Sequence, residues 1–256
     1  MAVKQRIAQQ FSLQAHRYDQ NSAIQELLAQ RMAGCFMEPM GKVIDVGSGT
    51  GHLATHCLSH GAQSIQMLDL SDAMLDIAKQ RILDSKPYFS VQTWAGDAET
   101  YVPEQKFNWI ISSAALQWFE NPAKFIAHSK KWLRPQGVCA LGSFGGKSWQ
   151  ELRQAYQQAL GQKLDNATHD IDAHLLQKWM MDAGYHNVQT FSEIVVQQWN
   201  TPRELLRHLK YMGVTGVKTR PPLKRQELLD LEQALVQPDG TIKLTWELVW
   251  ARGYNQ

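Results

Sequence analysis

The fold of this chain is decided by Gly41-Lys42-Val43-Ile44-Asp45-Val46-Gly47-Ser48-Gly49-Thr50-Gly51. Its apolar residues predict a short buried strand, and apolar residues at helical spacing follow the last glycine. Glycine allows positive φ angles and lets a ligand touch the backbone at a tight turn. The N-terminus of the following helix offers free N–H groups and a positive dipole end. The stretch therefore predicts a strand, a turn and a helix that together bind a polar or anionic ligand.

Three further segments strengthen this prediction. Asp69 ends the apolar run 65–68, and a carboxylate at this point can accept hydrogen bonds from both ribose hydroxyls of a nucleotide. The turn 96–98 follows a third predicted strand over 89–94, and the segment 113–118 follows a fourth over 107–112. The fifth predicted strand covers 138–141. Strands and helices that alternate over 42–143 predict a parallel sheet with helices on both faces.

Ligands of such sheets bind at the carboxyl ends of the strands. That edge carries Gly47, Asp69, Asp97 and Ser113. The acidic pattern D-x-G-x-G-x-G over 45–51 resembles the class I S-adenosylmethionine-dependent methyltransferases, and Gly96-Asp97-Ala98 resembles the turn that contacts adenine in that family. The resemblance implies S-adenosylmethionine as methyl donor. It also implies these donor-binding residues: Asp45, Gly47, Gly49, Gly51, Asp69, Leu70, Asp97, Ala98 and Ser113.

The resemblance also implies a fold class. We expect a doubly wound, mostly parallel α/β sheet of seven strands, with an antiparallel last strand and a helical cap between strands six and seven. The last strand, over 241–250, alternates with period two, which predicts one buried face. A single domain over 1–256 is expected, with a helical lid over 1–37 and the cap over 200–240. Helices are also predicted over 147–163 and 172–183, and a strand over 188–199.

Composition excludes several other classes. A net charge of +2 is too small to indicate nucleic-acid binding by itself. Cys35, Cys57 and Cys139 lie far apart in sequence and show no metal-ligand spacing, so neither a zinc site nor a disulfide framework is expected. The N-terminus lacks a secretory signal, and no long apolar run predicts a membrane span. A cytoplasmic monomer with reduced thiols and no metal is the expectation.

The cap is locally basic. Between Thr201 and Arg225 the only acidic residue is Glu204, and the basic residues are Arg203, Arg207, Lys210, Lys218, Arg220, Lys224 and Arg225. A solvated helix face is one interpretation of such a run. The other is a docking surface for an acidic partner, because Arg203, Arg207 and Lys210 share one face of a helix.

A narrower resemblance covers essentially the whole chain. Leu205–Gly216, the pair Tyr18-Asp19 with Gln25, and 113–118 resemble the malonyl-[acyl-carrier protein] O-methyltransferases of biotin synthesis. This family methylates the free carboxylate of a malonyl thioester on acyl-carrier protein, which would be the partner here. The expected roles are positioning for Tyr18, in the lid, and His208. Trp118, Arg203, Arg207 and Lys210 are expected to bind the substrate or its carrier. A carboxylate is ionised at neutral pH, so no general base is expected.

Three alternatives stay open at this point. Another methyltransferase of the same fold can act on a free carboxylic acid or a quinone precursor. A protein can bind S-adenosylmethionine for contact with a partner, without turnover. A nicotinamide oxidoreductase is disfavoured, because its fingerprint has the spacing G-x-G-x-x-G.

Overall fold

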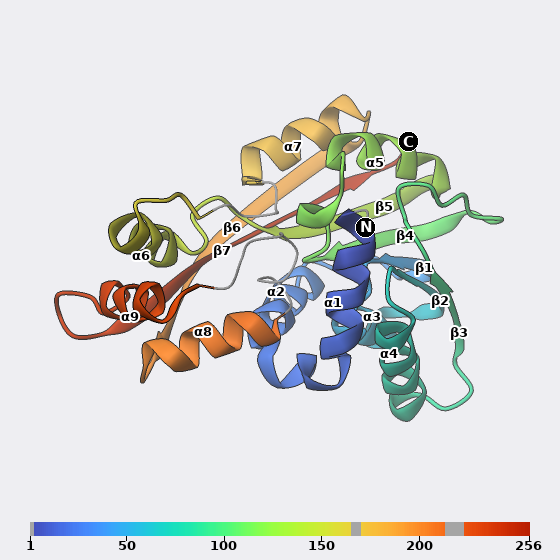
Figure 1. The fold of residues 1–256 in the computed structure, drawn as a ribbon. Coiled ribbons are helices and arrows are strands. Elements are labelled where there is room, and N and C mark those ends of the chain that lie inside the picture. The colour runs from blue at the N-terminus through green and yellow to red at the C-terminus, as the bar shows by residue number, and fades with distance from the viewer. Residues whose placement is uncertain (1–2, 165–169, 213–222) are drawn as a thin grey trace.

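The computed structural model describes residues 3–164, 170–212 and 223–256, which form one seven-stranded sheet (Figure 1). The first five strands along the chain pair in parallel, and the last strand is antiparallel to both of its neighbours. The predicted fold class is therefore confirmed. The spatial order of the strands is β3 (Ser90–Ala95), β2 (Ala62–Asp69), β1 (Gly41–Val46), β4 (Phe107–Ser113), β5 (Leu133–Phe144), β7 (Ile242–Tyr254) and β6 (His186–Trp199).

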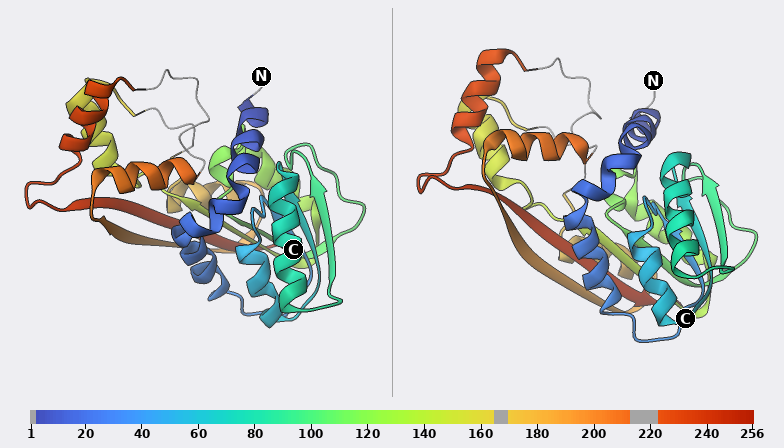
Figure 2. Two further views of the ribbon diagram at one scale, coloured as in Figure 1. Left: turned by 60° about the horizontal axis from the view of Figure 1, so that its bottom comes forward. Right: turned by 90° about the horizontal axis from the view of Figure 1, so that it is seen from below.

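Helices cover both faces of the sheet (Figures 1 and 2). One face is covered by α2 (Ala23–Ala33), α3 (His52–Cys57) and α4 (Asp72–Ser85), and the other by α5 (Pro122–Ser129) and α7 (Ala173–Asp182). Beyond one end of the parallel strands, α6 (Gln150–Leu160), α8 (Pro202–Tyr211) and α9 (Arg225–Ala234) gather along the long strands β6 and β7. Single 3-10 turns complete the helical elements, at Asp19–Asn21, Leu58–His60, Leu116–Trp118 and Lys130–Trp132.

The core has two parts, one on each face of the sheet. Successive residues of a strand point to opposite faces, so Val43 belongs to the part under α2 and Ile44 to the part under α5. The same alternation divides Leu248 from Val249 in β7. The prediction of one buried face for this last strand is wrong. Because β7 lies between β5 and β6 with helices on both sides, its residues 244–251 are all buried.

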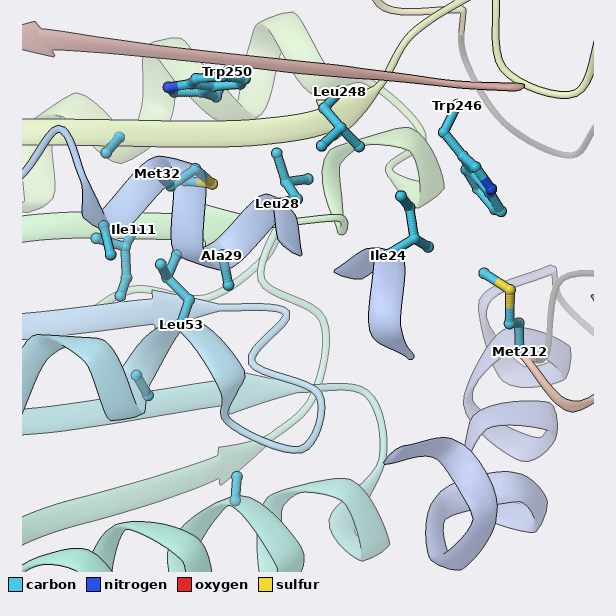
Figure 3. Packing of buried hydrophobic residues seen from close by; sticks show 14 of the residues in the cluster. Ile24, Leu28, Ala29, Met32, Leu53, Ile111, Met212, Trp246, Leu248 and Trp250 are labelled. Atoms are coloured by element: carbon cyan, nitrogen blue, oxygen red, sulfur yellow. The ribbon is translucent and has the colours of Figure 1, made fainter. Parts of the chain in front are cut away.

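Helix α2 lies close against the sheet. Figure 3 shows Leu28 and Met32 of this helix beside Leu248 and Trp250 of β7. A Cβ atom on Gly142 of β5 would come within 2.4 Å of the Met32 sulfur. The absence of a side chain at Gly142 therefore allows α2 to pack closely against β5. This contact holds α2 in place on the sheet.

Side-chain caps set the starts of several helices. The Asn121 side chain accepts a hydrogen bond from the Lys124 N–H at 2.9 Å, and Pro122 stands in the first turn of α5. Ser71, Asp172 and Thr201 cap α4, α7 and α8 in the same way. Such caps satisfy backbone donors that have no partner within the helix.

Two helix predictions differ from the structure. The segment 1–37, predicted to be helical, is not one continuous helix in its described part: α1 (Val3–Tyr18) ends at a 3-10 turn, and α2 begins after it. At this break the Asp19 carboxylate accepts a hydrogen bond from the Thr50 hydroxyl at 2.6 Å, in the distant glycine turn. The regular alternation of strands and helices also fails once, since no helix separates β3 from β4.

No helix in the described part of the chain is both long and apolar enough to cross a lipid bilayer.

Candidate functional site

A pocket lies at the carboxyl ends of the parallel strands, where α1 crosses them. Its walls come from the glycine turn, from the segments that follow β2, β3 and β4, and from Lys4, Ile7, Phe11 and Tyr18 of α1. Most of the predicted donor-binding residues line it: Asp45, Gly47, Gly49, Asp69, Leu70, Asp97, Ala98 and Ser113. Gly51 is not among the lining residues. It begins α3 with φ +84° and lets this helix pack against Ala78 of α4.

Asp69 ties the glycine turn to the end of β2. Its carboxylate accepts hydrogen bonds from the N–H groups of Gly49 and Ser71, each at 2.9 Å. The turn is also bonded to the strand itself, since the Gly47 N–H donates to the Leu68 carbonyl at 2.8 Å. Burial raises the pKa of the Asp69 carboxyl, although these backbone donors oppose the shift. The carboxylate is thus held rigidly in the pocket and keeps free lone pairs for a ligand.

Several buried polar atoms of this pocket lack a partner among the described residues. They are Asp45 Oδ2, Gln25 Oε1 and Ser113 Oγ. A buried polar atom without a hydrogen bond costs folding free energy, so such atoms indicate a ligand with donor groups. S-adenosylmethionine has an ammonium group that suits the acceptor oxygens of Asp45 and Gln25. It also has ribose hydroxyls that suit the carboxylate of Asp69. The residues present therefore fit this donor.

Asp45 gives the pocket a pH dependence. Burial, and then the charge of Asp69, raise the pKa of the Asp45 carboxyl to about 8, well above the ordinary value near 4. The folded chain holds this proton more tightly than the unfolded chain, so stability should fall as pH rises, by up to about 1.4 kcal/mol per pH unit for one such group. We expect the melting temperature of the ligand-free chain to fall between about pH 5 and 8, and Asp45→Asn to flatten this slope.

The control for this prediction is Asp84→Asn, at an exposed residue of α4 whose carboxylate accepts a hydrogen bond from Gln80. This variant should keep the wild-type slope in a thermal-shift series. The affinity for the cationic donor should rise with pH in the wild type, because binding favours the ionised Asp45. An Asp45→Asn protein with the same stability slope as the wild type would contradict the assignment.

Polar contacts at both ends of α1 hold the N-terminal segment over the pocket. Lys4 Nζ lies 2.5 Å from Asp97 Oδ2 and 2.6 Å from Glu99 Oε2. At the other end of α1, Asp19 is bonded to Thr50 and paired with Arg81. These contacts join residues far apart in sequence, so no local pattern could have identified Lys4 or Arg81.

A second pocket adjoins the first. The two share the lining residues Phe11, Tyr18, Gln25, Ala114 and Trp118. The remaining wall of the second pocket is largely aromatic or apolar, with Phe144, Trp149, Met212 and Trp246, and it includes Arg153 and Asp170. Tyr18 and Trp118, both predicted as site residues, thus stand where the pockets meet. Burial, and then the charge of Asp69, raise the pKa of the Tyr18 phenol well above its usual range. Tyr18 therefore stays neutral at physiological pH.

The predicted cap residues lie elsewhere. Arg203, Arg207 and Lys210 are exposed on α8, and neither pocket has them or His208 among its described lining residues. Arg203 pairs with Glu232 at 2.9 Å. His208 contacts Asn21 at 3.3 Å and packs on the Trp199 ring, and burial lowers its pKa. It therefore joins the cap to the N-terminal segment. Lys218 and Arg220 lie outside the described residues.

The fold and the donor pocket define a class of protein, the Rossmann-like methyltransferases. A family model described as a methyltransferase domain matches residues 14–190. The chain belongs to this family, and its methyl donor is S-adenosylmethionine. In the described part of the chain, no three His, Cys, Asp or Glu side chains come together as a metal site.

Two proteins with similar sequences carry the same name. A relative from Halalkalibacterium halodurans is 26% identical over 96% of this chain and 97% of its own length. One from Acinetobacter baylyi is 27% identical over 96% of this chain and 95% of its own. Both are named malonyl-[acyl-carrier protein] O-methyltransferase. This chain is thus similar to both of these enzymes, which carry the same name, over nearly their whole length.

Solved structures show the same fold. The YcgJ protein of Bacillus subtilis superposes with a TM-score of 0.63 at 14% identity, covering 90% of this chain and 97% of that one. Phosphoethanolamine N-methyltransferase 2 of Haemonchus contortus, solved with S-adenosylhomocysteine, gives 0.55 at 19% identity, covering 91% of this chain and 53% of that one. At these identities the likeness concerns the fold alone.

Proposed function

We propose that this chain transfers a methyl group from S-adenosylmethionine to the free carboxylate of a malonyl thioester on acyl-carrier protein. The observation that carries the proposal is the pair of adjoining pockets: one at the strand ends that is lined by the carboxylates of Asp45 and Asp69, and one beside it that has a largely aromatic or apolar wall. The names of the relatives, which match over almost the whole chain, support the choice of acceptor.

The residues of the chain can divide the work as follows. Asp69, Asp45 and the glycine turn hold the donor, which supplies a methyl group already activated by a positively charged sulfur. Tyr18, Gln25 and Trp118 belong to both linings and therefore position the two reactants against each other. The aromatic wall excludes water from the acceptor. A carboxylate has a reference pKa near 4, so it attacks as the anion without a base. Alignment of this kind can lower the activation free energy by roughly 7–11 kcal/mol.

The decisive experiment is mass spectrometry of malonyl-carrier after incubation with the protein and S-adenosylmethionine. The expected product is heavier by one CH₂ unit and returns to the starting mass on mild ester hydrolysis. Malonyl-coenzyme A, free dicarboxylic acids and a quinone precursor, incubated in parallel, are expected to react more slowly. Faster methylation of a free acid or quinone precursor would favour the other methyltransferases of this fold. Donor binding without any methylated product would indicate an interaction protein.

The exposed side of α8 is the proposed docking surface for the carrier. Arg207 and Lys210 are exposed there, while Leu205 and Leu209 of the same helix are buried. Acyl-carrier proteins are generally acidic, and a basic face increases the association rate of an acidic partner. We expect the double variant Arg207→Glu, Lys210→Glu to raise the KM for malonyl-carrier about 10-fold or more at low salt. The KM for S-adenosylmethionine should not change, because neither residue lines a described pocket wall.

The matched control is Lys178→Glu, an exposed charge reversal on α7, at the other face of the sheet. It should leave both KM values unchanged. Equal increases in the two KM values of the α8 variant would count against docking at this face. Arg203 is less informative, since it already pairs with Glu232.

The monomeric state and the cytoplasmic location stay predictions.

A further inference from the structure

The second pocket has one cationic side chain among its described lining residues, Arg153. This arginine stands in the first turns of α6, and Trp149, the residue just before this helix, lines the same pocket. The sequence pattern did not single it out, because the basic run of the cap lies some 50 residues later. Its position brings a positive charge to the pocket that adjoins the donor site.

Part of the hydrogen-bonding capacity of Arg153 is already used. Its Nη1 donates to the Gly146 carbonyl at 2.5 Å, and its Nη2 donates to Asp170 Oδ1 at 3.1 Å. A guanidinium group has five N–H donors in a planar fork. These two hydrogen bonds therefore orient the fork and leave donors for a ligand. The side chains of Arg153 and Asp170 are 30% and 66% exposed, which puts the pair at the mouth of the pocket.

A neighbouring atom also lacks a partner. Trp149 lines the same pocket, and its indole Nε1 is buried without a hydrogen-bond partner among the described residues. The Trp149 backbone is in the left-handed region, with φ +63°, which is costly for a residue with a side chain. Backbone strain of this kind is concentrated at ligand sites. The strained backbone is consistent with a ligand site, and the unpaired indole N–H indicates a ligand with hydrogen-bond acceptors.

We propose that Arg153 binds the carboxylate of the acceptor and that Asp170 limits how strongly it does so. The proposal rests on the proposed function, of which it specifies the acceptor site. Arg153 then binds the carboxylate itself, whereas Arg207 and Lys210 on α8 keep the proposed role of docking the carrier. Trp149 supplies a further N–H donor to the acyl group.

The charges of the reaction explain the need for Asp170. A carboxylate oxygen attacks the methyl carbon, and the bond between carbon and sulfur breaks with its electron pair passing to sulfur. The products are a neutral ester and a neutral thioether, so the negative charge on the acceptor decreases in the transition state. A cation beside the carboxylate therefore stabilises the bound substrate more than the transition state, and such binding does not increase kcat. Asp170 partly neutralises Arg153 and so reduces this penalty.

The neutral product also follows from this arrangement. After transfer, the ester no longer attracts the guanidinium, which remains paired with Asp170. Product release is then not opposed by a charge interaction. The pair thus selects the charged acceptor over its own methyl ester.

The test compares Arg153→Met, Arg153→Lys and Asp170→Asn. Arg153→Met should raise the KM for malonyl-carrier about tenfold or more with an unchanged KM for S-adenosylmethionine. Arg153→Lys should restore part of the loss, because it keeps the charge but not the fork. Asp170→Asn should lower both the KM for malonyl-carrier and kcat, a combination that a purely structural role would not produce.

A binding measurement without turnover completes the test. With S-adenosylhomocysteine present, Arg153→Met should weaken the binding of malonyl-carrier and leave the binding of its methyl ester unchanged. Equal weakening of both would mean that Arg153 contacts the carrier or the pocket wall, and would overturn the proposal. So would an Asp170→Asn enzyme with wild-type kcat and KM. A wild-type chain that binds malonyl-carrier but gives no product would instead contradict the proposed function.

Discussion

Replacing Asp69 by alanine should raise the apparent KM for S-adenosylmethionine at least about 100-fold, the free-energy equivalent of about 3 kcal/mol. Each hydrogen bond to a charged group contributes about 1.5–3 kcal/mol. The carboxylate can bind the ribose hydroxyls, and it also holds the N–H groups of Gly49 and Ser71 at 2.9 Å. Its loss therefore removes ligand contacts and releases the glycine turn together. Steady-state kinetics with varied donor concentration measures the effect.

Asp69→Asn should be less damaging, because an amide oxygen can still accept one of the backbone hydrogen bonds. Asp84→Ala, at an exposed residue of α4, is the matched control and should leave the donor KM unchanged. The donor should also raise the melting temperature of the control protein by mass action and that of Asp69→Ala hardly at all. A normal donor KM in Asp69→Ala would contradict a ribose contact at this carboxylate.

Gly47→Ala should abolish most methyl transfer, with a fall of at least about 100-fold, since small misplacements of reacting groups have effects of this size. Gly47 has φ +66°, and a Cβ atom there would stand 2.3 Å from the Ala115 Cβ. The turn must therefore move, and the moved backbone no longer fits a donor that lies against it. The measurements are donor affinity, by the thermal shift on adding S-adenosylmethionine, and the rate of methyl transfer.

Gly240→Ala separates backbone strain from the loss of the site. Gly240 also has a positive φ, +77°, but no atom lies within 4 Å of the position of its Cβ, in the connection between α9 and β7. Its replacement should cost about 1–2 kcal/mol of stability, the usual cost of a left-handed residue, with normal donor binding. A Gly47→Ala protein that loses the same stability but keeps its donor affinity would show that the turn does not contact the ligand.

The parts predictable from sequence are those in which neighbouring residues carry the signal. The glycine turn, the strands before and after it, and the caps at Ser71 and Asn121 all depend on short segments, and the structure has them in place. The carboxyl ends of parallel strands lie at one edge of the sheet, so the residues that follow these strands come together there. For this reason, Asp45, Asp69 and Asp97 could be placed near each other without coordinates.

Other features depend on partners distant in sequence. Asp19, at the break between α1 and α2, is bonded to Thr50 and Arg81, and the burial of both faces of β7 follows from its place between β5 and β6. Arg153 resembles any helix arginine until α6 folds beside β7. Its charge then lies in the second pocket, whereas Arg203, Arg207 and Lys210 of the conspicuous basic run lie on an exposed face of α8.

The sequence by itself determined the sheet, the donor site and the class of chemistry, because glycine geometry, strand periodicity and a carboxylate at a strand end act within a few residues. Only the tertiary structure decided which cation lines the second pocket, how the N-terminal segment is held over the first pocket and which side chains the two pockets share. The physical reason is that a pocket is made by side chains from many elements. Their contacts depend on packing that no single segment encodes.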